Sequence, residues 1–488
     1  MCHENAWHQD KLETQQKPMQ NLESQQTTKI IYSVIIVNIL CNYIFLSDIY
    51  RPHNIDDAWF LSLAYNLLKL NISSYDLMFN AGLSEGLLFF HKTGATLYGY
   101  FLELLGWDYS KGQVLSFMLM GISGFFWFLI LRKLEFDLKS RITFLLLFFY
   151  MEFSFTATNS IRYETLVLAL QSFALYLFFI RKFFLVGLIS VIAIECHPIA
   201  IMNLTYLLGL ILSNHGKEGF TQFFKPSHIQ WQPIFYFSVG CLIGVLYYFS
   251  LHPLPFTKLY DFLFLNSVQG VGKYQDTKLG ALGLYYFKAK FYRHLPELFI
   301  IFIALSIYLY KKKYKEKLYL LLWVVMLVIL NFLRPIQTYV AIIYPAFIVL
   351  MVASFHSIKK LNLLLIIFIT LMVPQYFGVY YLNKDWDRKN YVADISKLVP
   401  KDGLPVIGSA ISWHALKERK NYKAAIYPVS EANELEWKEL YFVEDYFIRE
   451  KEEYIGTLAY LDRHYNFSIV ETSNATGKPI VLKKLTRK

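Results

Sequence analysis

The sequence contains few charged residues: only 17% of its 488 residues are Asp, Glu, Lys or Arg. Hydrophobic residues account for 55% and aromatic residues for 18% of the chain, and the mean hydropathy is +0.34. Soluble domains need a charged, mixed surface, so this composition excludes a soluble globular protein. It indicates instead a protein that crosses a membrane several times.

Cysteine is also scarce, with four residues in the chain. Cys41, Cys196 and Cys241 lie in or beside apolar runs, and Cys2 lies in a polar segment. This pattern indicates neither a disulfide framework nor a cysteine metal site. Residues 1–29 are polar and lack the apolar core of a signal peptide, which predicts a flexible cytoplasmic tail.

Apolar segments long enough to cross a bilayer, about 20 residues each, recur up to Tyr381. The first, residues 30–47, is long enough to be a retained helix and not a cleaved signal. Segments at about 56–70 and 87–105 mix apolar and polar residues, which predicts external interfacial or re-entrant helices. The other predicted spans, about eleven in all with the first, are 113–131, 142–157, 164–180, 183–196, 198–213, 233–250, 296–310, 318–332, 337–355 and 361–381.

Lys and Arg gather in alternate short loops, which accounts for much of the formal net charge of +11. This bias is typical of cytoplasmic loops and not of a nucleic-acid-binding surface. It places the amino terminus in the cytoplasm and the end of the chain outside it. Residues 383–488 are polar with short apolar runs, which indicates a small α/β domain. The predicted fold is thus mainly α, with a transmembrane domain at 30–382 and an extracytoplasmic α/β domain at 383–488.

Ionisable residues of both signs lie on the predicted external side. Each has an ordinary explanation alone: an Asp pair favours a helix start, and an Arg can anchor a helix end at the interface. Together they combine carboxylates suited to proton abstraction with cations suited to phosphate. Such groups near lipid are costly and mark a functional site by default. The set is Asp56, Asp57, His91, Lys92, Glu152, Arg162, Glu164, Glu195, His197, Arg334, Gln337 and Tyr339.

Four short motifs in this set carry a family resemblance. In this order along the chain they resemble the GT-C glycosyltransferases, and the pattern is most similar to lipid A aminoarabinose transferases and protein O-mannosyltransferases. Two positions depart from the family: Thr93 follows the Lys where Pro is frequent, and Glu164 stands where Asp is usual. The motifs are Asp56-Asp57, His91-Lys92, Arg162-Tyr163-Glu164 and His197-Pro198.

The resemblance implies a multi-pass enzyme of the bacterial inner membrane that acts on a cell-envelope glycan. Its partners would be a sugar donor linked to polyprenyl phosphate, membrane lipid, and a glycolipid, polysaccharide or protein acceptor, with no nucleic acid. A single inverting displacement is implied, with Asp56 as general base and Asp57 as the second residue of the catalytic pair. Successive residues on a helix project about 100° apart, so the two carboxylates cannot face one cavity equally. Asp56 stands three and four residues before Trp59 and Phe60 of the apolar face, which gives it a modest preference as the residue turned toward the protein or lipid boundary.

The resemblance implies further roles for the remaining residues of the set. Lys92 and Arg162 would hold one phosphate, so we expect them to approach each other although about 70 residues of chain separate them. A divalent metal is implied as a cofactor at Asp57, Glu164 and His197. Glu164 and His197 are also predicted to bind substrate, together with His91 and, from the external ionisable set, Arg334 and Tyr339.

A membrane transporter of a polar or lipid-linked solute is the alternative function. Transporters place their sites near the bilayer midplane on broken helices and often contain internal repeats. The sequence shows no obvious repeat, and its external charges lie near predicted helix ends. A structural or assembly factor without chemistry is a third possibility, which would leave the mixed charges without a role.

Reporter fusions test the predicted topology. A reporter fused after Asn383 is expected to signal an external location. The short loops rich in Lys and Arg are cytoplasmic, and this position lies one span beyond such a loop. A reporter in the loop at Lys359 and Lys360 is expected to signal the cytoplasm. A cytoplasmic signal from the first fusion would put the candidate site on the wrong membrane face and contradict the prediction.

Overall fold

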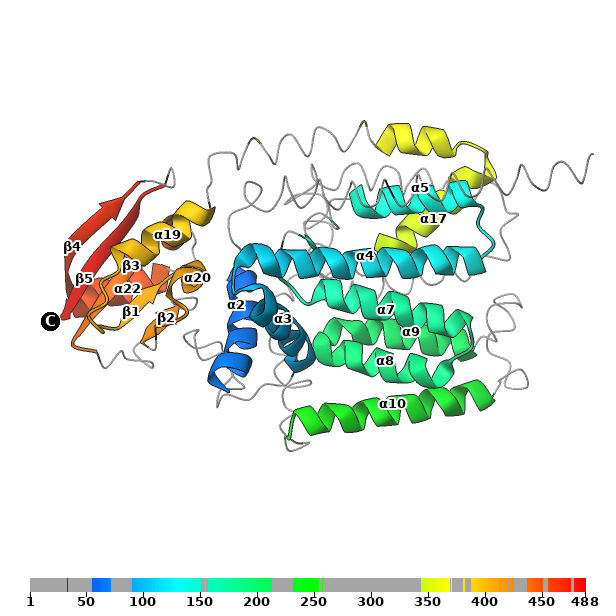
Figure 1. Ribbon diagram of the computed structural model, residues 1–488, viewed down its shortest axis with the longest axis horizontal. Coiled ribbons are helices and arrows are strands. Elements are labelled where there is room, and N and C mark those ends of the chain that lie inside the picture. Colours follow the sequence, from blue (N-terminus) through cyan, green and yellow to red (C-terminus); the bar gives the residue numbers. More distant parts are fainter. Residues whose placement is uncertain are drawn as a thin grey trace, which may run out of the picture.

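The computed structural model describes ten segments of the chain. Most of the described residues form helices that run side by side, and the last part of the chain forms a sheet beyond one end of these helices (Figure 1). The segments are 55–71, 90–150, 160–212, 231–253, 344–368, 388–419, 421–424, 437–450, 455–474 and 478–488, with isolated residues at 33, 154, 157, 158, 257, 370 and 381.

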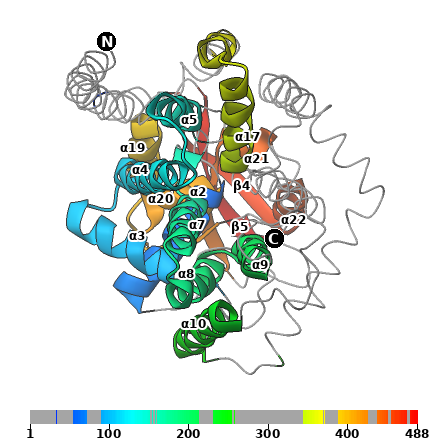
Figure 2. The same ribbon diagram turned by 90° about the vertical axis from the view of Figure 1, so that its right-hand side faces the viewer.

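The helices form a row in which each packs on the next. Seen along their axes, α4, α7, α8 and α10 follow one another, and α5 lies on the other side of α4 beside α17 (Figure 2). α9 follows the short helix η3 (Pro198–Ala200) and packs on α8. The bounds are α4 Tyr109–Lys133, α5 Leu138–Tyr150, α7 Glu164–Phe179, α8 Phe183–Cys196, α9 Ile201–Leu212, α10 Trp231–Leu251 and α17 Tyr344–Ser357.

Two helices in the described part of the chain, α4 and α10, are long and apolar enough to cross a bilayer. Shorter apolar helices accompany them at Glu164–Phe179, Phe183–Cys196, Pro198–Ile211 and Ile348–Ser357. α10 exposes large apolar side chains: Phe235 is 64% exposed and Leu246 58%. Such a face is unfavourable in water and suits lipid.

The structure tests only some of the predicted spans. Those between residues 113 and 250 coincide with α4 to α10. Of the last two, residues 344–357 form α17 and residues 361–368 are helical. The predicted spans at 30–47, 296–310 and 318–332 lie outside the described residues, so the expected number of spans stays a prediction.

Two helices lie across the end of the row, between it and the sheet (Figure 1). They are α2 (Ile55–Tyr65), which continues as the π-helix η1 (Asn66–Leu70), and α3 (Lys92–Leu105). The sequence predicted both at about these positions. The polar face expected on α2 is not exposed, however: Ser62 and Asn66 are almost fully buried.

The last hundred residues form the predicted α/β fold. The sheet has the strand order β2-β1-β3-β5-β4, in which β1 is parallel to both neighbours and β5 is antiparallel to both of its own. The bounds are α19 Arg388–Leu398, β1 Val406–Gly408, η10 Ala410–Ser412, α20 Trp413–Leu416, β2 Tyr422–Ala424, β3 Glu439–Glu444, α21 Tyr446–Glu450, α22 Ile455–His464, β4 Tyr465–Ser473 and β5 Ile480–Arg487.

The sheet domain packs directly on α2. The segment after β1, which forms η10 and α20, contacts α2. Trp413 is 1% exposed, and its ring lies edge-on to Tyr65 at 6.1 Å between centroids. Hydropathy could not predict this contact, because the two residues are far apart in the sequence.

Glycines allow α8 and α10 to approach closely. A Cβ atom on Gly187 would collide with the carbonyl oxygen of Phe237, and one on Gly240 with that of Phe184. Both obstacles are backbone atoms, which cannot rotate away. Small residues are the usual means of close helix packing in membranes.

We expect Gly240→Ala to lower the stability of the helix row by about 1–3 kcal/mol, because the added methyl group forces the two backbones apart. Thermal unfolding in detergent measures the change. Gly209→Ala is the matched control in α9, since nothing lies within 4 Å of a Cβ at that position. Equal unfolding temperatures for the two variants would contradict the close packing.

Candidate functional site

Asp57 is completely buried in α2 and ties three elements together. Its Oδ1 atom accepts a hydrogen bond from the backbone amide of Ile161 at 2.7 Å, and Oδ2 accepts one from the Tyr109 hydroxyl at 2.9 Å. Ile161 precedes α7 and Tyr109 begins α4, so this carboxylate fixes where both helices start. Asp56 lies beside it in α2, and its side chain lies outside the described residues.

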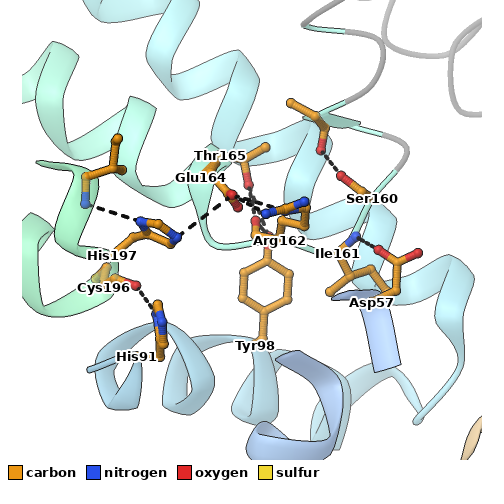
Figure 3. Close-up of polar contacts among 12 residues, drawn as sticks. Asp57, His91, Tyr98, Ser160, Ile161, Arg162, Glu164, Thr165, Cys196 and His197 are labelled. Carbon is orange, nitrogen blue, oxygen red and sulfur yellow. Dashed lines mark hydrogen bonds and ion pairs between the residues drawn. The ribbon is translucent and has the colours of Figure 1, made fainter. Parts of the chain in front are cut away.

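The loop before α7 carries the predicted Arg and Glu close together. The Nε and Nη2 atoms of Arg162 lie 3.0 and 2.7 Å from Glu164 Oε1. Oε2 of Glu164 is buried and has no hydrogen-bond partner in the described part of the protein. Figure 3 shows that His197 points toward the same carboxylate, with Nε2 at 4.0 Å from Oε1. Three predicted site residues therefore meet.

His197 presents an N–H group to this carboxylate. Its Nδ1 atom accepts a hydrogen bond from the amide of Ile199 at 3.3 Å. A backbone amide can only donate, so Nδ1 is unprotonated and the ring hydrogen lies on Nε2. His197 is thus a neutral donor that points at the Glu164 side of the cluster.

His91 lies next to this cluster in an uncommon conformation. Its φ is +80°, a left-handed value that costs about 1–3 kcal/mol in a non-glycine residue. Two bonds to the end of α8 hold it: its amide donates to Glu195 O at 2.7 Å, and Nδ1 donates to Cys196 O at 2.6 Å. Burial lowers the pKa of His91, so the ring is neutral at pH 7 and its lone pair is on Nε2. Its ring lies 5.2 Å from that of His197.

The close approach of α3 to the Arg162 loop depends on a glycine and an aromatic ring. A Cβ atom on Gly94 would lie 2.8 Å from Tyr163 Cγ, so only glycine allows this contact. Tyr163 donates a hydrogen bond to the Phe60 carbonyl of α2 at 2.9 Å. The residue between Arg162 and Glu164 thereby fastens their loop to α2 and α3.

Glu195 anchors α3 to α8, a role that the sequence did not reveal. Its carboxylate accepts hydrogen bonds from the amides of Lys92 and Thr93 at 2.8 and 3.0 Å and from His252 Nε2 at 2.9 Å. The first two bonds cap the start of α3, where unpaired amides would otherwise remain. The sequence analysis placed Glu195 in the external ionisable set but gave it no role.

The ammonium group of Lys92 binds a backbone carbonyl at the end of α10. Its Nζ atom donates to the Leu251 carbonyl at the end of α10 at 2.6 Å, and burial lowers its pKa. The described contacts do not join Lys92 to Arg162, so their shared phosphate remains a prediction. His91 directly precedes Lys92 in the chain, and its ring lies 5.2 Å from that of His197, which points toward Glu164. Arg334, Tyr339 and Glu152 lie outside the described residues.

The three predicted metal ligands do not fit a metal centre. Within the described residues, no group of three His, Cys, Asp or Glu side chains converges in a way that could hold a metal ion. Asp57 directs its oxygens at Ile161 and Tyr109, while Glu164 accepts from Arg162. The proposed reaction accordingly uses only the side chains of the protein.

Comparison with known proteins identifies the fold. No protein-family model and no curated protein sequence matches the chain. ArnT from Cupriavidus metallidurans bound to undecaprenyl phosphate matches with a TM-score of 0.59 at 9% identity, over 93% of this chain and 97% of ArnT. The apo structure of ArnT gives 0.54 at the same identity and coverage. An Archaeoglobus fulgidus oligosaccharyltransferase gives 0.47 at 11% identity, over 90% of this chain and 71% of that chain.

The match to ArnT extends over almost the full length of both chains. The predicted resemblance is confirmed at the level of the fold: the protein has the same fold as ArnT. At 9% identity this likeness defines the architecture, and the reaction has to be inferred from the site.

We expect Glu195→Ala to loosen α3, because two amides and His252 lose a buried acceptor at about 1–3 kcal/mol for each group left unpaired. Hydrogen exchange of residues 92–95 measures this opening. Glu103→Ala is the matched control at the other end of α3, where Glu103 makes an exposed ion pair with Lys69 that is worth at most about 1 kcal/mol. Unchanged exchange in Glu195→Ala would contradict the cap.

Proposed function

We propose that the protein is an integral membrane glycosyltransferase that transfers a sugar from polyprenyl phosphate to an acceptor outside the cytoplasm. The observation that carries this proposal is the buried cluster of Arg162, Glu164 and His197, with His91 beside it, at one end of the helix row. A lipid carrier needs a site of this kind, because its tail stays in the bilayer while its charged head reaches polar groups at the end of the helices. The shared fold supports it, since ArnT was solved with undecaprenyl phosphate bound.

Arg162 is the phosphate ligand in this proposal. Its guanidinium is a planar fork suited to two phosphate oxygens. The Oε1 atom of Glu164 binds both Nε and Nη2 of Arg162, and this contact orients the guanidinium. The side chain is 14% exposed, so a ligand can reach it. Lys92 adds a second positive charge if Nζ exchanges the Leu251 carbonyl for a phosphate oxygen.

Asp56 is the general base in this proposal, and Asp57 positions it. Both oxygens of Asp57 accept buried hydrogen bonds, so this carboxylate holds α2 in place. Asp56 projects about 100° away on the same helix. In the reaction the acceptor hydroxyl oxygen attacks the anomeric carbon, the bond from that carbon to the phosphate oxygen breaks, and the hydroxyl proton passes to Asp56. The phosphate leaves as an anion held by Arg162.

Binding of undecaprenyl phosphate tests the role of Arg162. We expect Arg162→Lys to weaken binding about tenfold or more, because a point charge cannot replace the fork and charge-assisted hydrogen bonds contribute about 1.5–3 kcal/mol each. Native mass spectrometry of the detergent-solubilised protein measures retention of the lipid. Arg181→Lys, at the opposite end of α7, is the matched control. Equal retention by the two variants would contradict the assignment.

Transfer assays separate the two aspartates. We expect Asp56→Asn to remain folded and to bind the lipid without transferring sugar, since the amide cannot accept the proton. Asp57→Asn is expected to lower the unfolding temperature, because an amide NH2 group replaces one buried acceptor. Transfer of labelled sugar from membrane lipid to the acceptor fraction measures the reaction. Full turnover by Asp56→Asn would remove it from catalysis.

A further inference from the structure

The C-terminal domain reaches the aspartate network through His414 in α20. The ring of His414 lies edge-on to the ring of Tyr109, with centroids 5.5 Å apart and planes at 87°. Tyr109 donates its hydroxyl hydrogen to Asp57, and Asp57 accepts the amide of Ile161. A continuous path of contacts therefore runs from α20 to the loop that carries Arg162.

This contact is buried, and a second one supports it. His414 is 6% exposed and Tyr109 7%. The neighbouring Trp413, 1% exposed, packs on Tyr65 of α2. Lys417 directly follows α20, and burial lowers its pKa. The negative charge of Asp108, the N-cap residue of α4, raises that pKa in part. The η10 and α20 segment thus contacts α2, and His414 contacts Tyr109 at the start of α4; Figure 1 shows α20 at the same end of the helix row as these two helices.

The geometry gives His414 an effect beyond filling space. The direction of the Tyr109 hydroxyl bond follows the orientation of its ring, and Asp57 needs this donor because it is fully buried. An edge-on aromatic contact fixes that ring and contributes about 0.5–1.5 kcal/mol. If the ring moves, Asp57 loses the Tyr109 donor, and the carboxylate that accepts the Ile161 amide is held less firmly.

We propose that His414 is a positioning residue of the site, through which the docked C-terminal domain holds Tyr109, Asp57 and the Arg162 loop in place. The proposal rests on the proposed function for its effect on transfer. Its structural part, the coupling of His414 to Ile161, does not depend on that function. The candidate site is accordingly complete only when the C-terminal domain is docked on α2.

Hydrogen exchange at the Ile161 amide tests the coupling in the full-length protein. His414→Leu is expected to speed exchange of the peptide containing Ile161 about threefold to tenfold, the range that corresponds to one aromatic contact. His414→Phe keeps an aromatic edge against Tyr109 and is expected to restore the slow exchange. The matched control is His464→Leu, which removes the contact of His464 with Tyr460 (4.4 Å between centroids) inside the same domain. This control is expected to leave the exchange rate of the peptide containing Ile161 unchanged.

A second variant distinguishes an effect of His414 on the Tyr109–Asp57 hydrogen bond from a general loss of stability. Tyr109→Phe removes only the hydroxyl group, and in this background His414→Leu is expected to have no further effect on Ile161, because both act on one bond. Additive effects, or an unchanged rate in His414→Leu alone, would overturn the proposal.

Transfer and lipid binding distinguish this proposal from the proposed function. His414→Leu is expected to lower kcat and to weaken the retention of undecaprenyl phosphate, because both the Asp57 network and the loop that carries Arg162 lose support. A parent protein that neither binds the lipid nor transfers sugar would contradict the glycosyltransferase. Altered exchange at Ile161 would still support His414 as the residue that holds the Asp57 network.

Discussion

Asp57 accepts hydrogen bonds from two residues that are distant in the sequence, in a setting where an unpaired carboxylate would be very unfavourable. Ile161 is 104 positions away and Tyr109 is 52 positions away. Their two bonds bring α2, the start of α4 and the loop before α7 to one point. The candidate site depends on this point, since Arg162 directly follows Ile161.

A second buried carboxylate acts in a similar way on the opposite side of the site. Glu195 caps α3 from the end of α8 and accepts a bond from His252. His91 takes its left-handed conformation between these two elements. The polar cluster thus lies between two anchors, one at Asp57 and one at Glu195. Rigid support of this kind is what a site needs to hold a phosphate and a reacting hydroxyl in a fixed geometry.

The sequence predicted the parts of the structure that depend on local pattern. Helices α4 to α10 follow from apolar runs, because a helix that crosses lipid must satisfy its backbone internally and be apolar over its length. The motifs placed Arg162, Glu164 and His197 in one candidate set without predicting their contacts, and the structure brings the three together. Asp57 shows why the rest could not be predicted: its partners lie in other elements, and nothing local marks Ile161 as a donor.

The contacts of the C-terminal domain were equally invisible to the sequence. Ser62 and Asn66 have the spacing of a solvent-exposed face and are nevertheless almost fully buried, and the C-terminal domain contacts α2. Lys92 was expected at a phosphate, and the structure places its Nζ on the Leu251 carbonyl. In each case a residue from a distant element determines the environment, and hydropathy carries no information about distant partners.

A cryo-EM structure of the protein with undecaprenyl phosphate tests the central claim most directly. The account predicts the phosphate within hydrogen-bond distance of the Arg162 guanidinium, at the end of the helix row where α2 and α3 lie, with the Asp56 carboxylate facing the same space. A phosphate bound at the opposite end, near Arg181 and Lys182, would contradict it.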